Sequence, residues 1–269
     1  MRRENPFLIT LAGFAGLLFL SPVLYSLWMS FQSSHGFYTG TVQFTLSNYV
    51  RAVGQHDFFR YLLNSIIVSA AVTILGLLFA TMAAFTFARF EFRGGKLLFA
   101  ATVATLMIPS HVTLIPNYLT LARVGLLDTY SGLILPAIAN GFAAFFLRQY
   151  IRGIPRSLDE AAYMDGATPL QVLRRIIVPI SRPAIYSMGL FIFLAEWNNY
   201  IWPLVAVNDD QLYTLQIGLS RLYKLNPGEG LIDWPLVMAA SVITMLPVIA
   251  GFMLVERHLV RGITMGAVK

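Results

Sequence analysis

Long apolar runs dominate the pattern of residues along this chain. Six stretches carry few charges and are each about 18 residues or longer, which is the length that a helix needs to cross the roughly 30 Å hydrocarbon layer of a bilayer. They cover about residues 7–31, 62–88, 97–115, 130–147, 183–205 and 235–255. The pattern predicts an all-α membrane protein with six transmembrane helices.

Composition supports a membrane protein, because 57% of the residues are hydrophobic and only 12% are charged, with a mean hydropathy of +0.67. Such a chain exceeds what a water-soluble core could hide. The Arg2-Arg3 start imitates a signal peptide, but the apolar run that follows is too long and no A-x-A pattern ends it. With no fixed-period repeat and no long linker, residues 1–269 are expected to form a single transmembrane domain.

The positions of the basic residues predict the orientation of the chain. Six spans place both termini on one side, and Lys and Arg near the ends of spans stay cytoplasmic. Most of the 19 basic residues lie at the termini and in the loops after the second and fourth spans; the other side holds Arg51, Arg60, Arg123, Arg221 and Lys224. Both termini are therefore predicted to be cytoplasmic. These loops account for the pI near 9.7, and no nucleic-acid partner is expected.

The loop between the fourth and fifth spans carries helix-start signals. Residues 157–160 (SLDE) and 168–171 (TPLQ) each fit a capping box, and the second has proline at its first helical position. Gly166 lies between them, where the first short helix must stop in a left-handed conformation. Pro179 and Pro183 mark the end of the second helix. The pattern predicts a helix, a tight turn and a second helix on the cytoplasmic side.

Two helices this short are not stable alone in water, so they must dock on another surface. They could pack beneath their own membrane domain, or they could form a rigid protruding surface that binds a cytoplasmic partner. The amphipathic pattern leaves both alternatives open.

The run EAAYMDGATPLQVLRRIIVP, residues 160–179, resembles the EAA loop of permease subunits in bacterial ABC importers. The stretches EWNNYIWPLV in the fifth span and DWPLVMAAS at the start of the sixth, and the ending LVRGITMGAVK, are similar to the smaller permease subunit of carbohydrate-uptake importers. The resemblance implies a type I ABC importer permease fold with a cytoplasmic EAA loop (residues 155–180) and a place in the bacterial cytoplasmic (inner) membrane.

The resemblance also implies the partners of the chain. It would form half of the translocation pathway for a sugar or oligosaccharide, together with a second permease subunit, two ATPase subunits, an extracytoplasmic substrate-binding protein and membrane lipids. ATP and Mg would be bound by the ATPase subunits, because the nearest phosphate-loop pattern here, residues 94–97 (GGKL), lacks the first glycine and the hydroxyl. Zero cysteines, four scattered histidines and no catalytic motif predict neither an enzyme nor a metal site.

In this family the EAA loop forms coupling helices that sit in a groove of the ATPase subunit. The resemblance assigns ATPase coupling to Glu160, Ala161, Ala162, Asp165, Gly166, Ala167, Arg174, Arg175, Ile176 and Pro179. The small Ala161 and Ala162 would let the helix sit close to its partner. Glu160 has two open roles, in the capping box or in a polar contact to the ATPase. Arg174 and Arg175 would pair with ATPase acids or with lipid phosphates.

The fifth span contains the polar candidates for the substrate pathway. An ionisable residue in mid-membrane costs roughly 2.5 to 3.5 kcal/mol, so Glu196 is not expected to face lipid. Asn199 and Tyr200 follow at i+3 and i+4 on the same helical face, with Trp197 nearby, and Asn140 in the fourth span is a further candidate. Amides, carboxylates and rings suit a sugar. Alternatively, these polar groups hold helices together, and both interpretations stay open.

Two other functions compete with sugar uptake. The stretch GEGLIDWPLVMAA also resembles glycerol-3-phosphate permeases, so glycerol-3-phosphate or a glycerophosphodiester is the alternative substrate, although no span has a basic residue in its middle to bind a phosphate. A secondary transporter is a more distant alternative, because it would need coupling-ion sites and usually internal repeats.

The longer outer loops, about residues 32–61 and 206–234, fit docking of the binding protein.

Overall fold

The computed structural model describes residues 6–54, 57–223 and 232–266, and these residues form helices and one isolated antiparallel bridge between Gln32 and Phe44. Three helices are long and apolar enough to cross a membrane: α1 (Pro6–Ser30), α4 (Phe58–Arg89) and α15 (Trp234–Gly266), the last over its part Trp234–Met253. Lys224, the GEG stretch, Arg2, Arg3 and the end of the C-terminal tail belong to the predictions but lie outside the described residues.

Two further helix pairs pass the same test of length and composition but are bent. In the first, α7 (Tyr130–Ile138) meets α8 (Gly141–Arg152) at 43°. In the second, the helical stretch Pro169–Ile180 meets α12 (Arg182–Trp197) at 80°. The described residues thus hold three candidate spans, or up to five if each bent pair is one span. A mostly helical membrane fold is confirmed, whereas the count of six spans is not.

The remaining helices are short. They are α2 (Ser34–Thr39), α3 (Ser47–Gly54), α5 (Gly95–Thr105), α6 (Leu114–Arg123), α9 (Ser157–Met164), α10 (Pro169–Val172), the π-helical segment η1 (Leu173–Ile177), α11 (Val178–Ile180), α13 (Ile201–Ala206), the 3₁₀ turn η2 (Asp210–Leu212) and α14 (Leu215–Leu222).

Three of the predicted continuous helices are interrupted, among them the fourth span, which breaks at the bend between α7 and α8. The prediction of one helix over residues 97–115 is wrong: α5 ends at Thr105, a series of turns follows, and α6 begins at Leu114. Pro109 lies in this break, and proline both lacks an N–H and moves the preceding residue out of the helical region. The predicted fifth span is likewise broken after Trp197.

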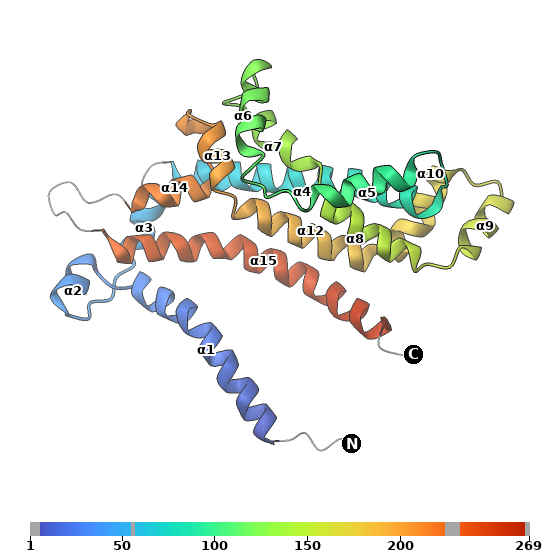
Figure 1. The fold of residues 1–269 in the computed structure, drawn as a ribbon. Coiled ribbons are helices and arrows are strands. Elements are labelled where there is room, and N and C mark those ends of the chain that lie inside the picture. Colours follow the sequence, from blue (N-terminus) through green and yellow to red (C-terminus); the bar gives the residue numbers. More distant parts are fainter. Residues whose placement is uncertain (1–5, 55–56, 224–231, 267–269) are drawn as a thin grey trace. The chain divides into compact units, whose positions relative to one another are not determined.

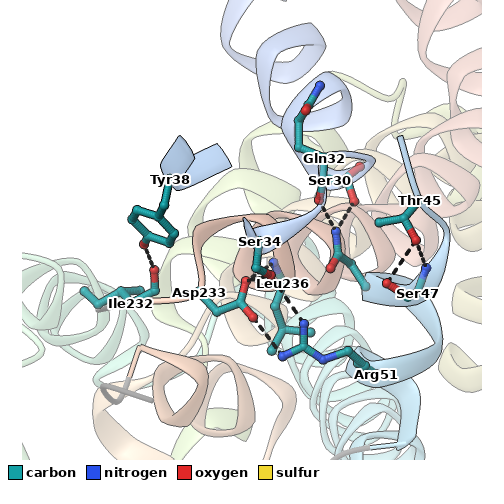
Figure 2. A network of polar contacts seen from close by, with 11 residues as sticks. Ser30, Gln32, Ser34, Tyr38, Thr45, Ser47, Arg51, Ile232, Asp233 and Leu236 are labelled. Carbon is teal, nitrogen blue, oxygen red and sulfur yellow. Dashed lines mark hydrogen bonds and ion pairs between the residues drawn. The ribbon is translucent and has the colours of Figure 1, made fainter. Parts of the chain in front are cut away.

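The chain forms two compact units, of which the first comprises residues 1–62 and 217–247. Figure 2 shows a polar network in this unit. Asp233 forms an ion pair with Arg51 (Nη2 to Oδ2, 2.8 Å) and accepts a hydrogen bond from the Ser34 hydroxyl at 2.7 Å. The Tyr38 hydroxyl donates to the Ile232 carbonyl. These bonds fasten residues 34–51 to the start of α15.

The second unit comprises residues 63–216 and 248–269. Its hydrophobic core draws side chains from several helices; the members with at most 2% exposure include Val72, Leu133, Leu147, Ile151 and Ile192. Within this unit α8 contacts both α5 and α12, and α13 contacts α6 and α7. Figure 1 shows α9 and α10 at the end of the unit that lies opposite α6, α7 and α13. The predicted coupling helices therefore lie together at one end of the helical core.

Candidate coupling site and translocation residues

The EAA loop contains the predicted helix, turn and helix. Gly166 has φ +80°, in the left-handed region, and ends the turn after α9. Thr168 and Gln171 form a reciprocal capping box: the Thr168 hydroxyl accepts from the Gln171 N–H (3.4 Å), and the Gln171 side-chain oxygen accepts from the Thr168 N–H (2.7 Å). These two local devices fix the direction in which α10 leaves the turn.

The other predicted capping box, over residues 157–160, is wrong. Arg156 holds the N-cap position with helical angles (φ −65°, ψ −25°), and its carbonyl already accepts from the N–H of Glu160 at 3.0 Å. Ser157 is therefore inside the first turn rather than before it. Glu160 therefore does not take part in a capping box, and its side chain is exposed.

A buried ion pair joins α9 to the C-terminal end of α4. Arg89, the last residue of α4, places its Nε 2.6 Å from Oδ2 of Asp159, and the two side chains are only 5% and 7% exposed. Arg89 also donates from Nη2 to the Ile154 carbonyl at 3.1 Å. Burial raises the pKa of Asp159, and the guanidinium charge of Arg89 opposes that rise. The pair was missed at the level of sequence, although a charge that ends an apolar run is the signal for it.

The predicted coupling residues divide into an outer and an inner set. Exposed are Glu160, Ala161, Asp165, Gly166, Arg174 and Arg175, and partly buried are Ala162, Ala167, Ile176 and Pro179. Ala162, Ala167 and Ile176 pack against the hydrophobic core. Met164 and Leu170 are 88% and 66% exposed. An apolar tip that is rimmed by polar residues is typical of a surface that binds another protein.

The second half of the loop ends in unusual helical geometry. Residues 173–177 form a π-helical segment, which carries the exposed Arg174 and Arg175, and Pro179 lies two residues beyond its end. Proline has no N–H to donate to the preceding turn, which favours a local change of helical pitch. The chain then bends by 80° into α12.

A hollow of about 410 Å³ lies beside α9. It is lined by Arg89, Phe90, Arg156, Asp159, Glu160, Tyr163 and Pro169. Both short helices and the end of α4 contribute to it, so a side chain placed there would touch the ion pair and the exposed Glu160 at once.

The polar residues of the fifth predicted span gather at a helix break. Because α12 ends at Trp197, the expectation that Glu196, Asn199 and Tyr200 share one helical face is wrong. Asn199 nevertheless donates from Nδ2 to Oε2 of Glu196 at 3.2 Å and accepts at Oδ1 from the Trp202 N–H at 3.4 Å. Tyr200 is 37% exposed. The break therefore contains a hydrogen-bonded carboxylate and amide, and Tyr200 follows them in the chain.

Trp197 and Asn140 have contacts within the chain. Trp197 is 2% exposed, its ring stacks on Phe193 with centroids 5.6 Å apart, and its carbonyl accepts from the Gln216 side chain at 3.2 Å. Asn140 accepts at Oδ1 from the Ala143 N–H at 2.9 Å, which caps α8 at the bend that follows α7. The structure does not bring Asn140 into the hydrogen-bonded group of Glu196 and Asn199.

Asn64 and Asp128 also fasten the chain, and sequence reasoning did not single them out. Asn64 donates from Nδ2 to the carbonyls of Gln211 and Tyr213, both at 2.9 Å. Asp128 accepts at Oδ1 from the backbone N–H groups of Asn208 and Asp209, and these bonds lower the pKa of Asp128. An amide inside an apolar run was the available signal for Asn64. Together these bonds hold residues 208–213 against other parts of the second unit.

The second unit is thus a set of apolar helices with two short helices, α9 and α10, exposed at one end. Residues 73–265 match the family described as binding-protein-dependent transport system inner membrane component, and the chain belongs to this family. Membership makes it an inner-membrane permease component of an importer that works with a binding protein.

Relatives with known names are also permease proteins of transport systems. The chain is 34% identical over 216 residues to the arabinooligosaccharides transport system permease protein AraQ of Bacillus subtilis, covering 80% of this chain and 75% of that protein. AraQ of Halalkalibacterium halodurans is 31% identical over 280 residues, 100% of this chain and 99% of that one. The sn-glycerol-3-phosphate transport system permease protein UgpE of Agrobacterium fabrum is 35% identical over 206 residues, 76% and 72% of the two chains.

A solved structure shares the fold. One chain of a bacterial ABC transporter involved in the import of the acidic polysaccharide alginate superposes with a TM-score of 0.84 at 26% identity, covering 96% of this chain and 98% of that one.

Proposed function

We propose that this permease carries a sugar or oligosaccharide, and that its EAA loop couples transport to two ATPase subunits. The names of the relatives support the substrate class, because AraQ is named for arabinooligosaccharides and the solved transporter for alginate. The observation that carries the coupling proposal is the exposed surface of α9 and α10, built on the left-handed Gly166 and the Thr168 capping box. Glycerol-3-phosphate is the second candidate, favoured by the similarity to UgpE.

The partners in this proposal are a second permease subunit, the two ATPase subunits that bind ATP and Mg, membrane lipids and a substrate-binding protein on the outer side. Both termini and the EAA loop face the cytoplasm, as the distribution of Lys and Arg predicts. Both compact units belong to one permease domain, since α4 and α15 each contribute to both. ATP binding would draw the two permeases from an inward-facing to an outward-facing arrangement by rigid-body motion.

Coupling in this proposal passes from the ATPase through α9 into α4. Glu160, Ala161 and Met164 lie on the exposed side of α9 and would touch the ATPase, while Ala162 faces the core. The ion pair between Arg89 and Asp159 ties α9 to the end of α4. A displacement of α9 would therefore also move α4, a helix long enough to cross the membrane.

The substrate pathway in this proposal uses the break after α12. Glu196 and Asn199 form a hydrogen-bonded pair, and the partly exposed Tyr200 lies directly after them. Carboxylate and amide oxygens bind sugar hydroxyls, and a phenol adds both a ring and a polar tip. Trp197 would support this group from the interior.

Glu196→Gln is expected to raise the KM for uptake by about tenfold, because a hydrogen bond to a charged acceptor is worth roughly 1.5–3 kcal/mol and the amide lacks that charge. Uptake of labelled substrate by proteoliposomes that contain the whole importer measures it. Glu256→Gln, at an exposed position of α15, is the matched control and should leave KM unchanged. An unchanged KM for Glu196→Gln would assign the pair to helix packing alone.

The function is tested by ATP hydrolysis of the reconstituted importer, with its binding protein, across a panel of oligosaccharides, monosaccharides and glycerol phosphates. A neutral sugar should stimulate hydrolysis severalfold over the level without substrate. Stimulation by glycerol-3-phosphate and by none of the sugars would move the assignment to the second candidate.

A further inference from the structure

A second and more basic hollow, of about 800 Å³, lies where α4 ends, α5 begins and α8 ends. Five cations line it: Arg93, Lys96, Arg148, Arg152 and Arg156. Among the described lining residues Glu91 is the one acid. Five positive charges in one hollow repel one another, and a negatively charged ligand between them would reduce this repulsion. The lining therefore favours an anion.

Arg148 is held in place from two sides. Its Nε donates to the Phe87 carbonyl at 3.1 Å, and its guanidinium carbon lies 3.8 Å from the centroid of the Phe99 ring. A guanidinium stacked in this way is rigid and desolvated on one face. Arg148 lines the hollow together with Lys96 and Arg152, and both of these residues are exposed.

The start of α5 adds backbone donors to the same lining. Gly94 takes the N-cap position in a left-handed conformation (φ 83°) with no side-chain capping bond, and Gly95 and Lys96 follow it in the wall of the hollow. The Gly95 N–H already donates to the Phe92 carbonyl at 3.0 Å, so Lys96 and Leu97 supply the backbone N–H groups at this helix start, where the helix dipole favours an anion, above all a phosphate. Residues 94–96 (Gly-Gly-Lys) lack the first glycine and the hydroxyl of an ATP-binding loop, but they suit a single phosphate group.

The hollow also has an apolar wall that continues along α5. Phe87, Phe92, Leu97 and Phe99 contribute to the lining. Within the described part of the chain, α5 has no buried residue, and Leu97 and Leu98 are 75% and 55% exposed. An anion with long hydrocarbon chains would satisfy both surfaces, whereas an inorganic ion would leave the aromatic wall bare.

We propose that this hollow binds the phosphate headgroup of an anionic glycerophospholipid, with the acyl chains lying along α5. The leaflet is the cytoplasmic one in the topology proposed above, and anionic headgroups attract clustered Lys and Arg at that surface. Phe90 and Arg156 line both this hollow and the one beside α9. A bound lipid would therefore lie next to the proposed coupling helices.

Native mass spectrometry of the intact importer tests the lipid site, with phosphatidylglycerol, phosphatidylcholine of the same acyl chains and inorganic phosphate as probes. Each cation near an anionic surface contributes a factor of about five to binding. The double variant Lys96→Gln/Arg152→Gln is therefore expected to bind phosphatidylglycerol about 25-fold more weakly than the wild type. Arg123→Gln, an exposed basic residue at the end of α6, should bind as the wild type does.

Any of three results would overturn the proposed lipid site. Equal retention of phosphatidylglycerol by the wild type and the double variant would place the bound lipid elsewhere. Displacement of the lipid by equimolar inorganic phosphate would show a site for a free anion. If the cations instead contact an acidic ATPase surface, the double variant will lose ATPase subunits from the complex at unchanged lipid retention, which also contradicts the proposal. None of these outcomes depends on which solute is transported, so they are distinguishable from a failure of the proposed function.

Discussion

Ala161→Trp is expected to reduce substrate-stimulated ATP hydrolysis and uptake by roughly tenfold or more, because overpacking a close contact costs about 1–3 kcal/mol. Ala161 is exposed on α9, so an indole there meets little of its own chain, unlike at Ala162, which packs against the core. The loss would therefore come from the contact with the ATPase. ATPase activity of the reconstituted complex with and without substrate measures it.

Ala122→Trp is the matched control, since Ala122 is also an exposed helical alanine but lies on α6, at the other end of the second unit. It should leave stimulated hydrolysis within about twofold of the wild type, as surface substitutions usually do. Wild-type coupling in Ala161→Trp, with the permease assembled and inserted, would show that the exposed side of α9 does not contact the ATPase.

Asp159→Ala is expected to lower the free energy of unfolding by about 3–5 kcal/mol, because it leaves the Arg89 charge buried and unpaired. Arg89 cannot release its proton to escape this cost. A thermal unfolding curve of the purified permease complex measures the loss, and stimulated ATP hydrolysis should fall with it as α9 loses its attachment to α4.

Arg89→Met is expected to be milder than Asp159→Ala, since the carboxyl group can neutralise itself by taking up a proton. Burial already raises the pKa of Asp159, and removing Arg89 takes away the charge that opposes this rise. A raised folded-state pKa means that the folded protein binds more protons than the unfolded one, so stability should increase as the pH falls toward the unfolded pKa near 4.

The double variant Arg89→Met/Asp159→Leu separates stability from coupling. Replacing both partners of a buried pair by apolar groups is often neutral for stability. Restored unfolding temperature and restored hydrolysis would show that the pair acts as an attachment that apolar packing can replace. Equal damage in Arg89→Met, Asp159→Ala and the double variant at every pH would contradict an ion pair at this position.

Local signals predicted the parts of the fold that local chemistry decides. The turn of the EAA loop follows from Gly166, which needs no Cβ in the left-handed region, and from the Thr168 and Gln171 side chains, which reach only their own backbone. The length of the apolar runs alone predicted the three long candidate spans, α1, α4 and α15. Each of these features depends on residues within a few positions of one another.

Long-range contacts decided the rest. The helix α9 begins one residue before the predicted start, with Asp159 buried against Arg89, a residue 70 positions away in sequence. The break after Trp197 places Asn199 as a partner of both Glu196 and Trp202, which hydrophobicity does not reveal. The interruption near Pro109 was visible in the sequence, but a mean over 18 residues hides it.

The most direct measurement is cross-linking of the EAA loop to the ATPase, because the chain contains no cysteine of its own. Met164→Cys and Met107→Cys form a matched pair, since the native side chains are 88% and 84% exposed, but Met164 ends α9 whereas Met107 lies in the break between α5 and α6. A short bifunctional thiol reagent, with a single cysteine on the ATPase groove, should join Met164→Cys to the ATPase and change the yield on ATP binding. Cross-linking from Met107→Cys, or none from Met164→Cys in an active importer, would contradict the proposed coupling.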